Sequence, residues 1–289
     1  MPELPEVEAL VAFVTRRAAG LSVSRAELGS LSALKTYDPP LEALVGRVVE
    51  GAERRGKYLC TRFGGAPGLW AVVHLARAGW LHWRERLAEG RARPGKGPLA
   101  LRVGFSDGSG FDLTEQGTEK RLAIWVVHDP AAVEGVARLG PDPLAPGFTE
   151  AVLAEALGRA GGQLKGALSD QSVLAGVGNA YSDEVLWAAH LSPFKAADRL
   201  SPEELGRLCS ALTGVLRAAV ERSMGAPAAE LKDAKRSGLS VHGRGGEPCP
   251  ACGARIREVH LATRSFQYCP QCQTGGKVLA DRRLSRLLK

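Results

Sequence analysis

Two Cys-x-x-Cys pairs near the end of the chain constrain its fold more than any other feature. They are Cys249-Pro-Ala-Cys252 and Cys269-Pro-Gln-Cys272, and 16 residues separate them. Two such pairs at this spacing can close a tetrahedral site of four thiolates, for which zinc is the usual ion. Because protein fills all four positions, we predict one structural Zn²⁺. Chance pairs of free cysteines and an iron–sulfur cluster are the alternatives.

The end of the chain is also its basic part. Residues 231–289 contain 12 Lys or Arg and 4 Asp or Glu, a net charge of +8, whereas residues 1–230 carry −1. A zinc ribbon would present Arg255 and Arg257 on a rigid hairpin between its cysteine pairs. Such a surface suits contact with phosphates. We therefore expect a nucleic acid as partner, and a merely solvated basic face is the alternative.

Several protein classes are excluded by the same sequence. No run approaches 18 apolar residues, so no membrane span is predicted. The first ten residues are acidic where a signal peptide needs basic residues. The four paired cysteines, with Cys60 and Cys209 as core thiols, fit a reducing compartment. We expect a cytoplasmic protein.

The period of the hydrophobic pattern changes along the chain. Residues 4–18 have helical spacing, and residues 45–128 alternate as strands, with Asp107-Gly108 as a hairpin turn. After a Pro- and Gly-rich linker the pattern is helical again, and Ser201-Pro202-Glu203-Glu204 is the clearest helix start. Residues 226–238 read as a mobile gap. The predicted class is α+β with several domains.

An ordered set of motifs resembles the formamidopyrimidine-DNA glycosylase/endonuclease VIII family. The resemblance extends from Met1 to Gln273. The matching segments are Met1-Pro-Glu-Leu-Pro-Glu-Val-Glu8, Arg55-Gly-Lys-Tyr-Leu59, His74-Leu75, Asp170-Gln-Ser-Val-Leu-Ala-Gly-Val-Gly-Asn-Ala-Tyr181, Val241-His-Gly-Arg244 and Arg264.

The resemblance implies a fold and its domain boundaries. The expected parts are an N-terminal catalytic antiparallel β-sandwich with an N-terminal helix over 1–138, a linker over 139–148, a helix–two-turn–helix domain over 149–240, a zinc β-ribbon over 241–273 and a basic tail over 274–289.

The resemblance also implies a function. It indicates a bifunctional base-excision-repair DNA glycosylase and AP lyase that removes oxidised purines (8-oxoguanine, formamidopyrimidines) and cleaves the strand by β/δ-elimination. The expected partner is damaged double-stranded DNA, bound by a monomer. An endonuclease VIII-like enzyme for oxidised pyrimidines and a non-catalytic zinc-ribbon DNA-binding protein are the alternatives.

The chemistry of such an enzyme can be read from its first residues. If Met1 is removed, Pro2 becomes a secondary amine that titrates near pH 8, about two units below a lysine, so part of it is nucleophilic at neutral pH. Attack on C1′ of a sugar gives an iminium that stays cationic and favours β-elimination. By resemblance, Glu3 is the general acid/base and Glu6 supports it. Helix stabilisation by these two carboxylates is the alternative.

The remaining site residues also follow from the resemblance. Lys57 is expected to be a proton donor or phosphate contact near the lesion, and Arg264 is expected to bind the flanking phosphate and assist the second elimination. Asn179, in the turn after Gly176-Val-Gly178, would hold a phosphate together with backbone amides. Further DNA contacts are expected from His74, Lys120, Arg121 and Lys165, although His74 could instead be a satisfied strand residue.

The chain departs from the oxidised-purine branch in the residues that fill the void left by an extracted base. Arg77 stands where a Met is typical, and the Arg-Arg-Phe-Gly loop is replaced by Lys120-Arg-Leu-Ala123. Arg77 and Leu122 are therefore the void-filling candidates. Gly225–Ala229 replaces a Ser/Thr-rich lesion-capping loop. These differences put the 8-oxoguanine preference in doubt.

Overall fold

A computed structural model describes residues 1–90, 92, 94–95, 97–260 and 265–280 of the chain. Their contacts group them into two compact units. The first unit consists of residues 1–138 and 222–234, and the second consists of the described parts of 139–221 and 235–289.

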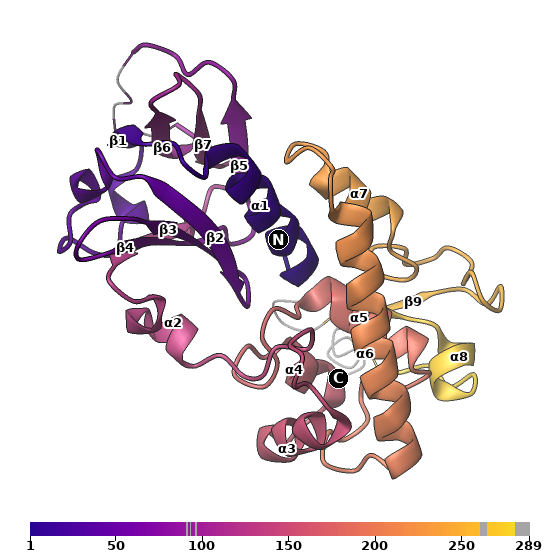
Figure 1. Cartoon of the computed structure of the whole chain (residues 1–289). Coiled ribbons are helices and arrows are strands. Elements are labelled where there is room, and N and C mark those ends of the chain that lie inside the picture. The colour runs from indigo at the N-terminus through magenta and orange to yellow at the C-terminus, as the bar shows by residue number, and fades with distance from the viewer. Residues whose placement is uncertain (91, 93, 96, 261–264, 281–289) are drawn as a thin grey trace. The chain divides into compact units, whose positions relative to one another are not determined.

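The first unit contains one long helix and two four-stranded antiparallel sheets (Figure 1). The strand orders are β1-β6-β7-β5 and β2-β3-β4-β8. The expected β-sandwich with an N-terminal helix is confirmed. The elements are α1 Leu4–Ala18, β1 Val23–Leu28, β2 Val49–Arg55, β3 Tyr58–Phe63, β4 Leu69–His74, β5 Gly79–Arg84, β6 Leu99–Phe105, β7 Gly110–Glu115, β8 Ala123–Val127 and α2 Glu134–Ala137, with short 3₁₀ turns at Leu31–Ala33, Leu41–Leu44 and Pro130–Ala132.

The core of this unit explains why residues 4–18 form a helix. Val7, Leu10 and Val14 recur at helical spacing, and all three are fully buried in one cluster with residues of both sheets. α1 lies beside β2 in Figure 1. Burial of each such side chain stabilises the fold by about 1.5–3 kcal/mol relative to an exposed one. The packing therefore fixes the start of α1 on the sandwich.

The β6–β7 hairpin has the turn that the sequence predicts. Gly108 has φ +86°, a backbone conformation that glycine adopts without strain. One carboxylate oxygen of Asp107 accepts hydrogen bonds from both the amide and the hydroxyl of Ser109, at 2.9 and 2.7 Å. The hydrogen bond from the Ser109 hydroxyl is the main reason why the pKa of Asp107 is lowered.

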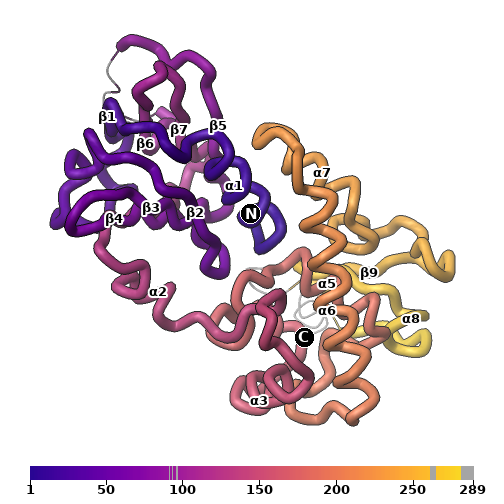
Figure 2. Tube along the Cα trace, in the orientation of Figure 1, coloured from indigo at the N-terminus to yellow at the C-terminus, as the bar shows by residue number. Residues whose placement is uncertain are grey.

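The second unit is helical and ends in the ribbon, which is drawn in yellow in Figure 2. The predicted cap of α6 is present, since Ser201 Oγ accepts from the Glu204 amide and a Glu204 oxygen accepts from the Ser201 amide. The elements are α3 Glu150–Ala160, α4 Leu164–Ser169, α5 Asn179–Ala188, α6 Pro202–Ser223, β9 Arg257–His260, β10 Ser265–Tyr268 and α8 Pro270–Thr274.

The segment after α6 differs from the mobile gap that its composition indicates. It contains the helix α7, Leu231–Ser237, and Ala228 and Leu231 are buried in the core of the first unit. The indole nitrogen of Trp80 donates a 2.7 Å hydrogen bond to the Ala228 carbonyl, and the Lys232 ammonium lies 4.7 Å from the Trp80 ring centroid. Two apolar side chains and one tryptophan thus order a segment whose Ala, Gly and Lys content suggested a loop.

None of the helices in the described part of the chain has both the length and the apolar character needed to cross a bilayer.

Candidate functional site

The N-terminus of α1 holds the first group of predicted site residues. Pro2 is buried behind an exposed Met1, and Glu3 and Glu6 are 2% and 1% exposed. The Glu3 amide donates to a Glu6 oxygen at 2.8 Å, and the Glu3 side chain accepts from the Glu6 amide, which completes a capping box. Both carboxylates therefore lie at the positive end of the helix dipole. Pro2 therefore lies next to the buried carboxyl group of Glu3, whose orientation the capping box fixes.

A second anchor holds α1 against the adjacent sheet. The Arg54 guanidinium of β2 contacts Glu8 of α1 at 2.6 Å, and the Arg54 side chain is only 8% exposed. Since a partly buried, charge-assisted contact resists displacement more than an exposed one, α1 is tied to the strand that leads into Lys57.

Lys57 lies in the turn between β2 and β3 and is 6% exposed. The turn needs Gly56, which has φ +56°. Burial, together with the charge of Lys57, lowers the pKa of His74 to about 4. His74 ends β4, and its ring lies 5.0 Å from that of Tyr58. His74 is therefore neutral at physiological pH, so it could contact DNA through a hydrogen bond and not through charge.

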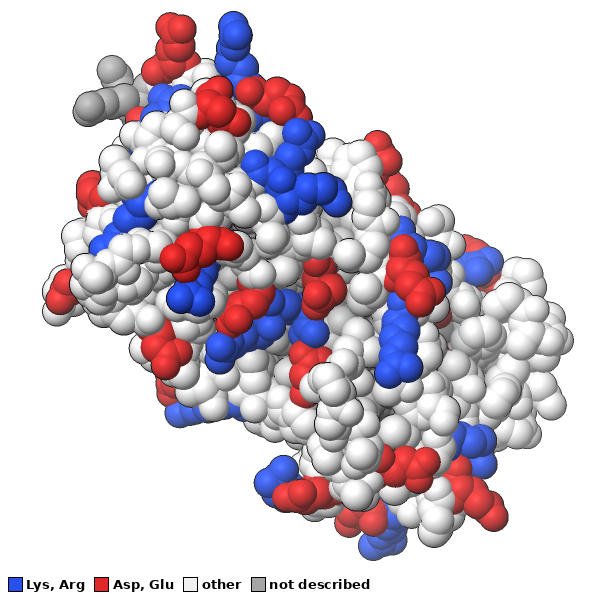
Figure 3. Space-filling model, viewed as in Figure 1, with Lys and Arg blue, Asp and Glu red and all other residues white. Residues whose placement is uncertain are grey.

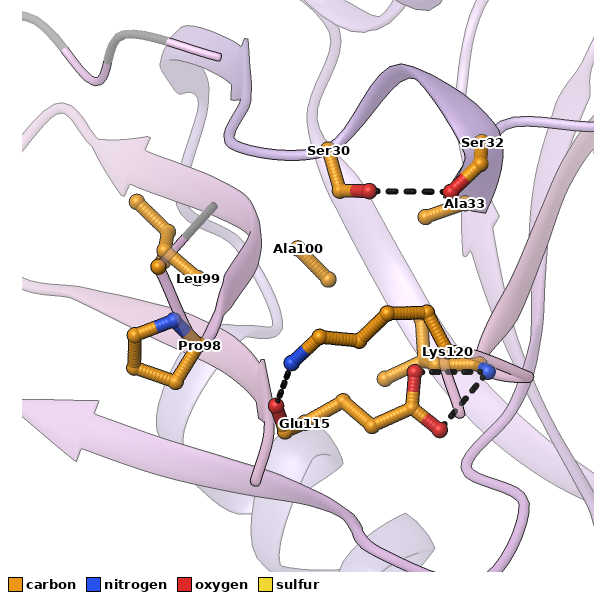
Figure 4. A pocket seen from close by; sticks show the side chains of 10 residues that line it. Ser30, Ser32, Ala33, Pro98, Leu99, Ala100, Glu115 and Lys120 are labelled. Carbon is orange, nitrogen blue, oxygen red and sulfur yellow. Dashed lines mark hydrogen bonds between the residues drawn. The ribbon is translucent and has the colours of Figure 1, made fainter. Parts of the chain in front are cut away.

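The loop after β7 is organised by Glu115. The Glu115 carboxylate is buried and accepts hydrogen bonds from the amides of Arg121 and Leu122 at 2.9–3.1 Å. The Lys120 ammonium donates back to the Glu115 carbonyl (Figure 4), and Arg121 pairs with Glu119 at 2.8 Å on the surface. Lys120 and Arg121 are both exposed and remain predicted DNA contacts.

Leu122 contradicts its prediction as a void-filling residue. It is 2% exposed and belongs to the core of the first unit. The loop is turned inward at this position by the two hydrogen bonds to Glu115, so the leucine packs under the sheet instead of projecting. The pocket beside it in Figure 4 encloses about 10 Å³, roughly the space for one water molecule and not for a base.

Arg77, the other void-filling candidate, is exposed in the turn between β4 and β5. It follows Ala76, which has φ +51°, an uncommon conformation for a residue with a side chain. Strained backbone of this kind is often found where a turn presents a functional side chain. The role of Arg77 stays a prediction.

In the second unit, the glycine turn before α5 has the predicted form. Gly176 has φ +86°, and α5 begins at Asn179 directly after Gly178. The side-chain nitrogen Nδ2 of Asn179 donates a 2.8 Å hydrogen bond to the Ser265 carbonyl of β10. Lys165 is 6% exposed, and its ammonium donates to the Asn179 carbonyl and the Ser182 hydroxyl, each at 2.7 Å. The predicted phosphate contacts Asn179 and Lys165 are thus adjacent and tied to the ribbon.

Three residues next to this turn were not identified as site residues from the sequence. Asp183 and Glu184 are buried in α5, and His242 pairs with Asp183 at 2.6 Å. The signal was present in the run Ser182-Asp-Glu184, three polar residues inside an otherwise apolar helix. Arg264, predicted to bind a phosphate, lies outside the described residues.

The four paired cysteines form the metal site. Their ligand atoms all lie within 4.8 Å of one another, and three of the Sγ–Sγ distances are 3.4, 3.5 and 3.9 Å. A tetrahedron with Zn–S bonds of about 2.3 Å places its sulfur atoms about 3.8 Å apart, so the geometry fits zinc. The site holds one structural zinc ion.

The pKa values of these thiols are shifted in opposite directions: that of Cys249 is lowered, whereas burial raises those of Cys269 and Cys272. Burial raises the pKa of Cys249, but hydrogen bonds from the amides of Ala251 and Cys252 outweigh it and bring the pKa to about 7. One thiolate is therefore accessible near neutral pH before the metal binds. The others lose their protons as the ion arrives, because only the thiolate is a ligand.

The charges of the described residues are mixed on the face shown in Figure 3. Lys and Arg side chains (blue) alternate there with Asp and Glu (red). The net charge of +7 is therefore not gathered into one basic surface on this face.

The sequence matches three family models in order along the chain. They are the formamidopyrimidine-DNA glycosylase N-terminal domain over residues 1–120, the formamidopyrimidine-DNA glycosylase H2TH domain over 139–229, and the zinc finger found in FPG and IleRS over 246–275.

Similar proteins cover almost the whole chain. A formamidopyrimidine-DNA glycosylase of Symbiobacterium thermophilum is 36% identical over 293 residues, which is 98% of this chain and 93% of the relative. The structure of the Lactococcus lactis formamidopyrimidine-DNA glycosylase, non-covalently bound to DNA containing an AP site, has a TM-score of 0.80 at 27% identity and covers 94% and 99% of the two chains. A MutM structure in complex with DNA containing carbocyclic 8-oxo-G has a TM-score of 0.82 at 27% identity and covers 94% and 100%.

Proposed function

The chain belongs to the formamidopyrimidine-DNA glycosylase family and is a DNA glycosylase of base excision repair, and on this premise we propose that it is bifunctional. It removes an oxidised base from double-stranded DNA through its N-terminal proline and then cuts the strand as an AP lyase. The observation that carries this proposal is the buried carboxyl group of Glu3, held by Glu6 directly beside Pro2.

In the first step, Pro2 acts as the nucleophile once Met1 has been removed. Its nitrogen forms a bond to C1′ while the N-glycosidic bond breaks, and the bonding electrons leave with the base, which takes up a proton. The proline nitrogen then loses its own proton. Its lone pair expels O4′ and opens the sugar ring to an iminium.

Glu3 supplies the proton that O4′ needs, and can later remove one from the substrate. Its rotation is restricted because Glu6 holds its amide and because its own oxygen accepts from the Glu6 amide. A buried acid that is held in a fixed orientation stabilises the transition state more than the same group does in water.

The lyase step follows from the charge of the iminium. The cation acidifies the proton on C2′, and loss of that proton expels the 3′ phosphate by β-elimination. The second elimination, at the 5′ side, is assigned to Arg264. Lys57, buried beside a neutral His74, provides a fixed positive charge for a phosphate or a proton for the leaving group.

Binding of the strand is assigned to residues of both units. In the first unit, His74, Lys120 and Arg121 contact the DNA. In the second, Lys165 and Asn179 hold a phosphate at the start of α5, where helix amides point outward. The chain works as a monomer, and the zinc keeps the ribbon folded.

The proposed substrates are oxidised purines, 8-oxoguanine and formamidopyrimidines. The DNA of one structural relative supports this choice, since it contains carbocyclic 8-oxo-G. Arg77 replaces the typical methionine and could fill the void with a charged side chain. This departure keeps oxidised pyrimidines as the second candidate substrate class.

Borohydride trapping tests the proposal on three duplexes, which carry an abasic site, 8-oxoguanine or thymine glycol. We expect a covalent adduct with the abasic duplex and with 8-oxoguanine. Adducts with thymine glycol alone would favour the endonuclease VIII-like activity. DNA binding without an adduct on any duplex would favour the non-catalytic DNA-binding protein and refute the proposal.

A further inference from the structure

Helix α5 buries three consecutive polar residues, which is unusual in a helix of ten residues. Ser182, Asp183 and Glu184 are 0%, 1% and 4% exposed. Removing a carboxylate from water is costly unless charges or hydrogen bonds compensate it. The partners of these carboxylates therefore indicate what they are for.

Asp183 binds groups from three separate segments. One oxygen lies 2.6 Å from the Lys165 ammonium of α4. The other lies 2.6 Å from Nδ1 of His242 and accepts from the Gln267 amide of β10 at 3.2 Å. The side chain of Asp183 is fully buried and that of Lys165 is 8% exposed. The Asp183 carboxylate thus links α4, the start of the ribbon and β10.

Glu184 fixes the backbone beside this cluster. Its carboxylate accepts from the amides of Ser240, Val241 and His242 at 2.7–2.9 Å. The His242 ring is therefore placed by both its backbone and its side chain. Because an ionised carboxylate only accepts, His242 donates to Asp183 through Nδ1–H.

We propose that Asp183 is a positioning residue for DNA recognition, which keeps the ammonium of Lys165 charged and fixed at the start of α5. The proposal rests on the proposed function, because it takes Lys165 as a DNA contact. Lys165 in turn donates to the carbonyl of Asn179, the other predicted phosphate contact of this unit. Asp183 itself does not touch DNA in this account.

The electrostatic reason lies in the groups around Lys165. Asp183 supplies the negative charge from α5, and Ser182 supplies an acceptor. The His242 ring also contacts Asp183, and the His242 amide donates to Glu184. Glu258 accepts a hydrogen bond from the side chain of Gln267. The segment at 193–195 contributes the backbone carbonyls of Pro193 and Lys195 to α4. Without the charge of Asp183, the buried Lys165 ammonium would lose its anionic partner and keep neutral acceptors, so it would release its proton more readily.

The test uses Asp183→Asn, which keeps the shape of the side chain and removes its charge. Binding of a duplex with a non-cleavable abasic analogue is measured from pH 6 to 9 for the wild type, Asp183→Asn, Lys165→Met and the double variant. Asp112→Asn is the matched control, because it removes another buried carboxylate, which pairs with Arg102 in the first unit. Zinc content and near-ultraviolet circular dichroism report the fold.

We expect Asp183→Asn to bind about tenfold more weakly at pH 7.5, because a neutral amide holds the Lys165 ammonium at the start of α5 less firmly than a carboxylate does. Its affinity should fall further than that of the wild type as the pH rises to 9, because Lys165 becomes neutral. Lys165→Met and the double variant should bind equally and lack this additional pH dependence. Asp112→Asn should match the wild type.

Two results would overturn the proposal. One is an Asp183→Asn affinity that parallels the wild type at every pH. The other, which remains available if Asp183→Asn alone does not fold, is a double variant that binds more weakly than Lys165→Met. A wild type that neither binds the abasic duplex nor forms a trapped adduct would refute the proposed function instead, so the two failures are distinguishable.

Discussion

Glu3 caps the N-terminus of α1, where it is buried and shares a capping box with Glu6, whereas Glu8 is partly exposed. We predict that Glu3→Gln slows excision of 8-oxoguanine by about 10²–10⁴-fold, the usual contribution of a general acid. Cleavage of a preformed abasic site should suffer less, since part of its sugar is already ring-opened and needs no proton on O4′. Single-turnover rates on the two duplexes measure both effects.

Glu8→Gln is the control for this substitution. Glu8 lies one turn further along α1 and contacts Arg54, so its loss removes a charge pair without touching Pro2. Its rates should stay near those of the wild type. Equal losses in the two variants would mean that Glu3 acts only by stabilising the helix.

His74 makes stability depend on pH with a defined sign. Its pKa is about 4 in the folded chain, because of burial and the charge of Lys57, against about 6.5 when unfolded. The unfolded state therefore binds more protons between these values, and stability is lost as the pH falls from 6.5 to 4, by up to about 3 kcal/mol. His74→Gln should flatten this part of the profile.

Denaturant unfolding followed by tryptophan fluorescence measures the profile, and His128→Gln serves as control because His128 is exposed in the same unit. A wild-type profile that is retained in His74→Gln would show that another group titrates. Zinc loss at low pH affects all variants alike, so the difference between them is the informative quantity.

At the residue scale, the sequence identifies groups by type and spacing but not by burial. Pro2, Glu3 and the four cysteines form local patterns; the structure brings the four cysteines together and buries Glu3 next to Pro2. Leu122 differs from its prediction because its inward turn depends on Glu115, seven positions earlier in the chain. Asp183 was missed because its partners come from α4, β10 and the ribbon linker.

The zinc ribbon is the element whose folding depends most on one ion. We predict that Cys269→Ser releases the zinc and weakens DNA binding by more than tenfold, because the ribbon lacks a large core of its own. The first unit should stay folded. Zinc content, affinity for an abasic duplex and the fluorescence of the sandwich tryptophans measure the three effects.

Cys209→Ser provides the matched control, since Cys209 lies half-buried in α6 outside the cluster. It should keep one zinc ion per chain and normal affinity. Unchanged DNA affinity in Cys269→Ser would contradict a role of the ribbon in binding.

The segment containing α7 gives a second test at the element scale. Trp80→Phe removes the hydrogen bond to the buried Ala228 carbonyl and should cost about 1–2 kcal/mol of stability. Amide exchange over residues 225–237 should accelerate. Trp83→Phe is the control, because the buried Trp83 indole nitrogen has no hydrogen-bond partner among the described residues. Equal exchange in the two variants would show that Trp80 does not order the segment.

Elements with a local cause were predictable from the sequence. The Ser201 cap, the Asp107-Gly108 turn and the period of α1 are all set by neighbours in the chain. The segment 226–238 was not, because its order depends on Trp80, almost 150 residues earlier. Long-range packing of this kind leaves no signal in local composition.

At the scale of the molecule, the fold class and the family follow from ordered motifs that span nearly the whole chain, and the three family models match the same order. The net charge of +7 indicates an anionic partner but no reaction. The reaction is assigned to the nearly neutral part of the chain, which contains Pro2, Glu3 and Lys57.

The central claim is that Pro2 forms the covalent bond to the sugar. The most direct measurement is mass spectrometry of the borohydride-trapped adduct with abasic DNA, digested to peptides. A variant with one residue inserted between Met1 and Pro2, which keeps the proline nitrogen in an amide, is the control. We predict that the sugar remnant is found on the N-terminal proline of the processed chain and that the variant forms no adduct. A remnant on a lysine, or an undiminished adduct with the variant, would contradict the account.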